Sequence, residues 1–290
     1  QLPVLKGSNL VVEYFRNSSD NVTASFPLLT PDIEAAFPGR VTRDGAGRLI
    51  AIDQRPVTFY QQESSRLRSG LNLSGGFGSA EGAGGGGSPR PMGAGPGGPR
   101  PSGGGGPPRA GGGGGRGGGM GAIFGAMGGQ PGRWSLGVFH TVQFTSRVTI
   151  APGGPVLDLL GGDSLSAAGT PRHSFEFNGG LFYKGLGMFA QGTWSAPTRV
   201  AGSGLPGSSD LRFGSVTNVN MFLFLDLSAR PKWVRQVPFL KGMRVGIRVE
   251  NLFDSHQRVT DGSGQVLQSY QPDYLDPRGR VIGVSLRKVF

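Results

Sequence analysis

The sequence predicts an all-β fold, a transmembrane antiparallel β-barrel of which this chain supplies about eight strands. Three observations lead to this prediction. Apolar residues alternate with polar or small residues in one segment after another, as in strands with one apolar and one polar face. The alternation persists for eight or more residues, whereas a typical soluble strand has about five or six. No apolar run approaches the roughly 20 residues that a membrane-spanning helix needs.

The last alternating segments illustrate the pattern. In 243–250 the odd positions are apolar and the even positions are Arg, Gly or Glu, and in 281–290 the apolar face is continued by Ile282, Val284 and Leu286. Aromatic residues gather near segment ends, as an interfacial girdle requires. A soluble β-sandwich also alternates and is the competing interpretation, but segment length and aromatic placement favour the membrane barrel. The predicted strands lie near residues 9–15, 66–77, 134–150, 174–183, 186–194, 218–227, 243–250 and 281–290.

Composition divides the chain into three parts. Residues 1–77 are predicted to hold barrel strands and a long loop at 16–57, in which Thr30-Pro31-Asp32 favours a short helix to Phe37 and 41–53 a small hairpin. Residues 78–132 are a Gly/Pro-rich block that offers too little apolar surface to offset its ordering entropy. We expect a disordered insertion, dispensable for folding. Residues 133–290 hold the remaining strands, with loops at 151–172, 195–212 and 252–280 at one end of the strands and turns at 183–186 and 229–241 at the other.

The charge of +11 does not by itself indicate a nucleic-acid partner. The basic residues are scattered over strand positions, where an aqueous barrel interior accounts for them, and the Arg-Gly-Gly stretch at 116–118 lacks the dense arginines and aromatics of RNA-binding segments. We therefore predict no nucleic-acid binding. The glycine pattern at 202–207 contains a proline where a phosphate-binding helix would begin.

No enzymatic activity, cofactor or metal is expected. The chain has no cysteine, so a thiolate nucleophile or ligand is excluded, and its three histidines have no ligand spacing. The candidate functional residues instead lie on the predicted inner face, where they would attract an anionic ligand or another domain, or would only solvate the wall and pair with one another. These inner-face candidates are Arg66, Arg68, Gln143, Arg244, Arg248, Glu250 and Arg287.

The end of the chain resembles the carboxyl terminus of TonB-dependent outer-membrane receptors. The features are Glu250-Asn251-Leu252-Phe253-Asp254, the run Asp276-Pro277-Arg278-Gly279-Arg280, and a final strand that ends in Phe290. The Gly-rich block followed by Arg133-Trp134-Ser135-Leu136, and residues 155–160 ahead of Pro171-Arg172-His173, are similar to a glycine-rich, sphingomonad-type subfamily. The resemblance is specific in motif for residues 241–290 and otherwise rests on the strand pattern.

This resemblance implies a barrel of about 22 strands around an N-terminal plug, with TonB supplying energy through the plug. It also implies that the final strand runs toward the periplasm. The loops at 16–57, 151–172, 195–212 and 252–280 would then be extracellular, and the disordered insertion at 78–132 and the turns at 183–186 and 229–241 would be periplasmic. The chain departs from that plan, because it has about eight predicted strands and no recognisable plug. We therefore expect the C-terminal part of an active importer for a scarce nutrient (a metal chelate, cofactor or saccharide) in the cell outer membrane. Its partners would be the remainder of the receptor, the TonB complex, outer-membrane lipid and the barrel assembly machinery, which would recognise Phe290.

In the last long loop, Tyr270, Asp273 and Tyr274 would contact the ligand or hold the loop's own turns. The alternative to the importer is a self-contained eight-stranded barrel with a structural or adhesive role. The interior discriminates between them, because an eight-stranded barrel is filled by side chains and the inward Phe222, Phe224 and arginines would crowd it.

Overall fold

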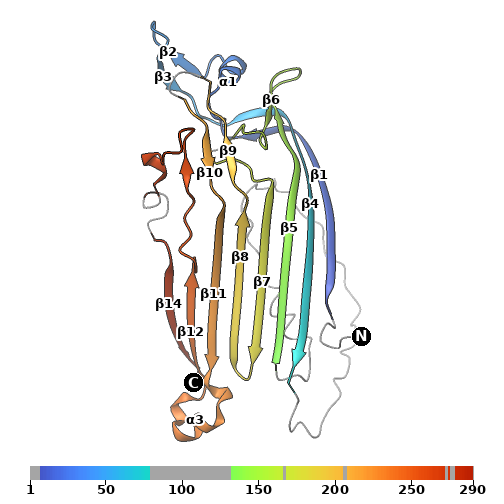
Figure 1. The fold of residues 1–290 in the computed structure, drawn as a ribbon, viewed down its shortest axis with the longest axis vertical. Coiled ribbons are helices and arrows are strands. Elements are labelled where there is room, and N and C mark those ends of the chain that lie inside the picture. The colour runs from blue at the N-terminus through green and yellow to red at the C-terminus, as the bar shows by residue number, and fades with distance from the viewer. Residues whose placement is uncertain are drawn as a thin grey trace, which may run out of the picture.

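The computed structural model describes residues 7–78, 132–165, 168–204, 208–271, 274 and 278–289. The predicted Gly/Pro-rich insertion therefore lies, except for its two ends, outside the described residues. One large antiparallel sheet forms the body of the molecule (Figure 1), and a short strand, β6 (Val156–Asp158), pairs with one of its members. The main strands, in spatial order, are β1 (Asn9–Ala24), β4 (Val57–Phe77), β5 (Gly132–Thr149), β7 (His173–Tyr183), β8 (Leu186–Ser195), β11 (Val216–Asp226), β12 (Met243–Glu250) and β14 (Val281–Lys288).

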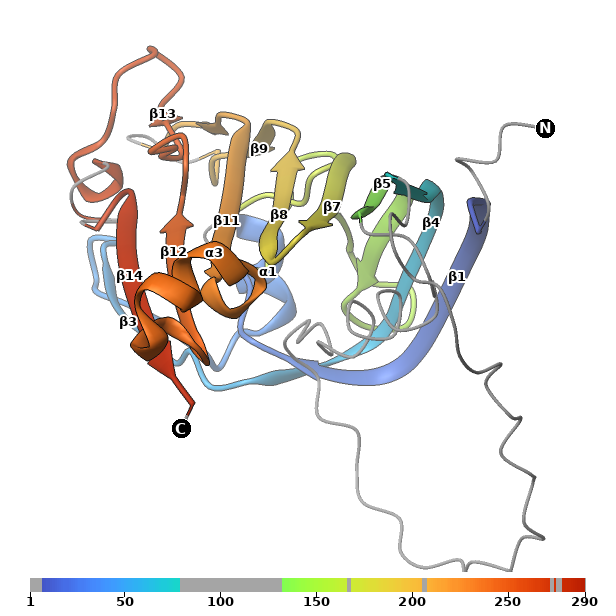
Figure 2. The same cartoon turned by 90° about the horizontal axis from the view of Figure 1, so that it is seen from below.

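The sheet curves into an open trough rather than lying flat (Figure 2), so it has a concave and a convex side. Strands β1 and β14 occupy its two edges, and among the described residues they are not paired with each other. The prediction of a mostly antiparallel all-β fold is thus confirmed. None of the helices in the described residues has the length and apolar composition to cross a membrane.

The turns at one end of the sheet follow from local sequence. Lys184 and Gly185 join β7 to β8 with φ of 46° and 82°, the two left-handed residues that a two-residue hairpin needs. The predicted turn at 229–241 is not a plain loop, because it forms α3 (Pro231–Gln236), flanked by the 3-10 turns η2 (Leu227–Ala229) and η3 (Pro238–Leu240). Pro231 and Pro238 each start a helical turn, where the missing N–H costs nothing.

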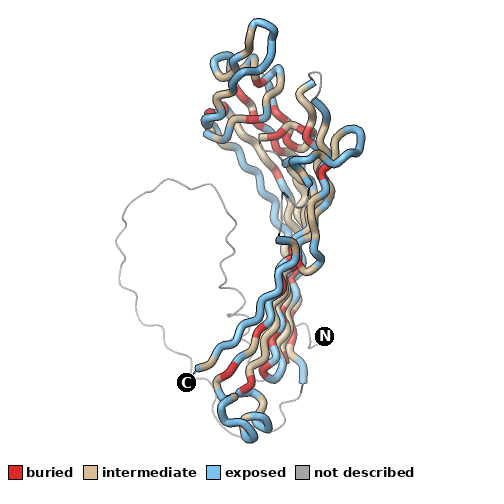
Figure 3. The backbone as a smooth tube through the Cα atoms, turned by 90° about the vertical axis from the view of Figure 1, so that its left-hand side faces the viewer, coloured by how far each residue is buried: buried red, intermediate tan, exposed pale blue. Residues whose placement is uncertain are grey.

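The two faces of the sheet differ in chemistry, as the alternation predicts. On the apolar face large side chains remain exposed; Ile282, Val284 and Leu286 of β14 are 65%, 76% and 68% accessible. Most residues along the main sheet are exposed or of intermediate burial. A group of buried residues lies in the loops at the upper end of the molecule in Figure 3. Other exposed residues of the apolar face are Leu10, Val12, Tyr14, Leu71, Val138, Phe175, Met188 and Ile247.

The loop predicted at 16–57 is shorter than expected, because β1 and β4 remain paired from Asn17–Ser64 out to Ala24–Val57. The prediction ended the strand where the apolar alternation stops, at Phe15, whereas backbone pairing continues through polar residues. The helix and hairpin expected inside the loop are present as α1 (Pro31–Ala36), β2 (Val41–Arg43) and β3 (Leu49–Ile52). Thr30 Oγ1 accepts the N–H of Ile33 and so caps α1.

The loop covers residues that were predicted to face lipid. Ile33 of α1 is fully buried against Val148, near the end of β5, and Ile150, just beyond it, which are 1% and 4% exposed. A register shift opposite Ser65 and Arg66 interrupts β5, so its apolar row does not continue outward to Ile150 as predicted. The end of β5 therefore belongs to the core of the loop region.

The predicted loops at 195–212 and 252–280 contribute a small second sheet that the sequence pattern did not indicate. It consists of β9 (Thr198–Val200), β10 (Leu211–Phe213) and β13 (Val259–Thr260), in the order β13-β10-β9. Its strands have two or three residues, which is too short for a readable period.

Glycines on the main sheet make room for aromatic rings of neighbouring strands. Gly70 of β4 lies opposite Phe139 of β5, and Gly187 of β8 lies opposite Phe224 of β11. A Cβ atom at either glycine would overlap the facing ring. These glycines are thus part of the packing rather than flexible points, and they account for some of the high glycine content.

We predict that Gly187→Ala destabilises the fold by about 1–3 kcal/mol, the usual cost of overpacking. The Phe224 ring cannot easily retreat, since it contacts Phe189 and lies under the guanidinium of Arg244. Gly283→Ala on β14 is the matched control, because a Cβ added at Gly283 would have no other atom within 4 Å. Urea unfolding in detergent measures both variants, and equal loss in the two would contradict the packing role.

Candidate functional site

The strand registers place the predicted inner-face residues on one side of the sheet. Arg66 lies opposite Gln143, Arg68 opposite Glu13, and Arg248 opposite Phe222. Side chains alternate between the two faces along each strand, and paired residues of neighbouring strands share a face. The pairings across the sheet therefore put the whole set on the polar face. The set is Arg66, Arg68, Gln143, Arg244, Arg248, Glu250 and Arg287.

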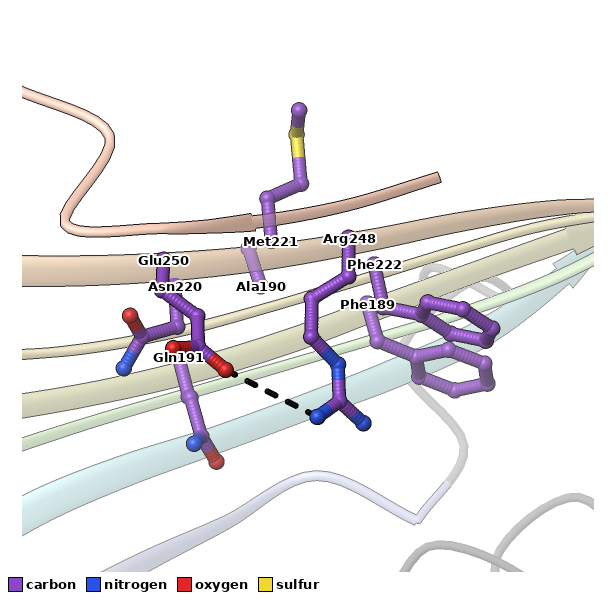
Figure 4. Close-up of a pocket in the computed structure, with 8 residues that line it drawn as sticks. All are labelled: Phe189, Ala190, Gln191, Asn220, Met221, Phe222, Arg248 and Glu250. Carbon is purple, nitrogen blue, oxygen red and sulfur yellow. Dashed lines mark ion pairs between the residues drawn. The ribbon is translucent and has the colours of Figure 1, made fainter. Parts of the chain in front are cut away.

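A cavity of about 350 Å³ lies on this face over β8, β11 and β12. Figure 4 shows the polar and aromatic side chains of the pocket projecting to one side of the strands, while Met221 projects to the other. Arg248 Nη1 lies 3.6 Å from Glu250 Oε1 across the cavity wall. The side chains that point into it belong to Phe189, Gln191, Asn220, Phe222, Arg248 and Glu250.

The pocket has an aromatic end and a polar end, which follow from alternate positions of β8 and β11. Phe222 and Phe224 are two apart on β11, so their rings lie together with centroids 5.8 Å apart, and Phe189 stacks on Phe224 at 6.0 Å. Asn220 and Gln191, directly opposite each other, form the polar end. Apolar surface beside a few placed polar groups is the usual composition of a small-molecule site.

Arg244 extends the aromatic end toward the α3 side. Its guanidinium lies 4.7 Å from the Phe224 ring centroid and 3.3 Å from Asp226 Oδ2. Arg287 lies opposite Arg244 in the ladder and lines a smaller cavity of about 240 Å³ together with Asp226. One carboxylate thus faces two guanidiniums at this end of the polar face.

Arg68 connects three strands at the other side of the sheet. It lies 3.6 Å from Glu13 of β1 and 3.3 Å from Glu176 of β7, and its guanidinium covers the Phe139 ring at 4.1 Å. The space over Gly70 is what admits that ring. Arg66 in turn lies 5.1 Å over the Phe15 ring. Three of the predicted arginines, Arg68, Arg244 and Arg248, therefore have carboxylate partners on the same face.

The structure adds residues that sequence reasoning did not select. Phe189, Gln191 and Asn220 line the pocket, and Glu13 and Glu176 partner Arg68. Alternation already placed them on the polar face. Their proximity to the selected arginines, however, depends on strand register, which a single sequence does not specify.

The candidate residues of the last loop and the chain terminus occupy different environments. The Tyr270 ring packs edge-on against Phe213 at 5.8 Å, so it supports the small sheet. Tyr274 is 71% exposed. Asp273 and the predicted assembly signal Phe290 lie outside the described residues.

Two histidines that are distant in sequence meet on the apolar face. His140 Nε2 lies 3.2 Å from His173 Nδ1, and the His140 ring stacks on Phe175 with centroids 4.3 Å apart. Within the described ranges no three His, Cys, Asp or Glu side chains gather as a metal site would require. The pair is therefore best understood as polar packing between strands β5 and β7.

Comparison with known proteins finds no matching family model, no similar curated protein and no matching solved structure.

We predict that Arg68→Met lowers the free energy of unfolding by about 1 kcal/mol, because it removes two half-exposed ion pairs and a cation–π contact. The loss should shrink as salt is raised, since screening weakens those pairs in the parent protein. Arg16→Met on β1 is the control, because Arg16 forms no ion pair within the described residues. Equal losses in both variants, or no dependence on salt, would contradict the network.

Proposed function

We propose that the chain is the barrel portion of a TonB-dependent active importer of a scarce nutrient, such as a metal chelate, cofactor or saccharide, in the cell outer membrane. The observation that supports this most is the curved antiparallel sheet with an exposed apolar face and a polar opposite face. A wall between lipid and an aqueous interior needs this division.

The apolar face suits lipid better than water. Exposed large side chains extend from Leu10 on β1 to Leu286 on β14, across the whole width of the sheet. Monomeric soluble proteins rarely leave a contiguous apolar surface of that extent uncovered. Contact with acyl chains would satisfy it without any partner protein.

The edges of the sheet support the need for further strands. Open edges in lipid leave unpaired N–H and C=O groups, each of which costs several kcal/mol. β1 and β14 are not paired with each other in the described part of the chain. In the proposal, the remaining barrel strands, on the same or another polypeptide, complete the ladder at both edges and enclose a plug.

The polar face would then line the transport path. Arg68, Arg248 and Glu250 carry charges on it, and the aromatic and amide ends of the β8–β12 pocket could contact a nutrient or the plug. The dependence on TonB rests on the terminal motif from Glu250 to Phe290 alone. The assembly machinery, as the partner that recognises Phe290, rests on the same motif.

A self-contained eight-stranded barrel is the second candidate. It would require β1 and β14 to pair and the interior to be filled by side chains. The separation of these edges and the open cavity over β8, β11 and β12 favour the larger barrel.

The membrane orientation can be tested with adjacent cysteines, since the chain has none of its own. We predict that Arg248→Cys, in the polypeptide that carries this chain, reacts with a water-soluble maleimide in isolated outer membranes. Ile247→Cys, one residue earlier on β12, should instead be quenched by brominated acyl chains after labelling with a small fluorophore in detergent. Equal aqueous reactivity at the two positions would reject the membrane wall.

The incomplete barrel can be tested with the 290-residue chain expressed by itself. We predict that it aggregates or is degraded, because two open edges remain in lipid. Size-exclusion chromatography in detergent and limited proteolysis measure the outcome. A monodisperse, protease-resistant monomer in which cysteines at Leu10 and Leu286 form a disulfide would favour the self-contained barrel instead.

A further inference from the structure

A second cavity, of about 710 Å³, lies among the loops at the end of the sheet opposite α3. Four arginines line it, Arg172, Arg199, Arg212 and Arg258, and none of its described lining residues is acidic. It is distinct from the β8–β12 pocket, with which it shares no lining residue.

The small sheet explains why these arginines face one another. Val200, Phe213 and Val259 on one of its faces are almost completely buried and pack together. Because side chains alternate, the opposite face must present Arg199 and Arg212. The register sets these two directly opposite each other on β9 and β10, and Thr260 of β13 lies beside Arg212.

Like charges at directly opposed positions of an antiparallel pair are destabilising. The protein compensates only in part. Asp210 forms an ion pair with Arg199 and accepts a hydrogen bond from the backbone N–H of Gly202. These two interactions, that with Gly202 first, hold the pKa of Asp210 below its usual value. Within the described residues, Arg172, Arg212 and Arg258 form no ion pair.

We propose that this arginine pocket binds a soluble ligand that carries two neighbouring phosphate groups. Arg212 and Arg258 lie on the same face, and in the described residues no carboxylate pairs with either guanidinium. Two such free forks match two oxyanion groups, since each fork can donate a bidentate pair of hydrogen bonds. Thr260, beside Arg212 on the same face, lines the cavity and carries a hydroxyl that can donate a further hydrogen bond. The volume is within the range of small-molecule sites. Binding here is independent of transport and holds whether or not the chain forms part of an importer.

Inorganic pyrophosphate is the probe. The polypeptide that carries this chain, purified in detergent at low salt, is titrated with it by calorimetry. We expect saturable binding that weakens as salt rises. Arg212→Gln and Arg258→Gln should each weaken it about tenfold, the usual effect of one charge-assisted hydrogen bond. Arg212→Lys should also weaken it, because it keeps the charge but loses the fork.

Arg235→Gln on α3, at the far end of the sheet, is the matched control and should bind as the parent does. Circular dichroism and thermal unfolding establish that each variant is folded. Removing one of two opposed arginines should not destabilise the small sheet. The proposal is overturned if pyrophosphate does not bind, if the Arg212 and Arg258 variants bind as tightly as the control, or if only phosphate-bearing lipid binds.

Discussion

The backbone ladder of the main sheet is the constraint on which the rest of the structure depends. Because every strand is antiparallel to its neighbours, one register fixes which face each side chain occupies. Leu10 lies opposite Leu71, and Val249 opposite Ile282, so apolar residues meet apolar residues at both edges of the sheet. A slip of β12 by one residue would bring Arg244 and Arg248 to the apolar face. The glycine–phenylalanine pairs, such as Gly187 with Phe224, lock that register further, because a ring fits only where its neighbour lacks a Cβ.

Sequence periodicity predicted most of this ladder because the strands present two chemically different faces. It predicted α1 as well, since Thr30 and Pro31 specify a helix start by local chemistry. The prediction from periodicity was wrong where backbone pairing continues beyond the end of the alternating side-chain pattern. β1 continues past Phe15 through polar residues, and Val148 and Ile150 are covered by a loop whose position no local signal specifies.

The sequence predicted which face of the sheet the candidate site residues occupy, but it did not predict which side chains they contact. Alternation placed Arg68 and Arg248 on the polar side. The partners of Arg68, however, lie on β1 and β7, with β5 between β4 and β7, so only the register brings Glu176 within reach. The contact between the arginines of the small sheet was even less predictable from the sequence. Arg199 and Arg212 meet on strands of three residues, which are too short to show any period.

The two pockets differ in how far their charges are paired, and the difference follows from the sheets on which they lie. On the main sheet, Arg248 has an acid two residues along its own strand and Arg244 has one on the neighbouring strand, so these two charges are partly compensated. In the small sheet, the apolar residues Val200, Phe213 and Val259 need one face for their core, and the arginines must share the other. In the proposed importer, the first arrangement would present paired charges to a solute that passes along the wall. The second concentrates positive charge at the end of the sheet, where an anion arriving from solution would meet it before it reached the wall.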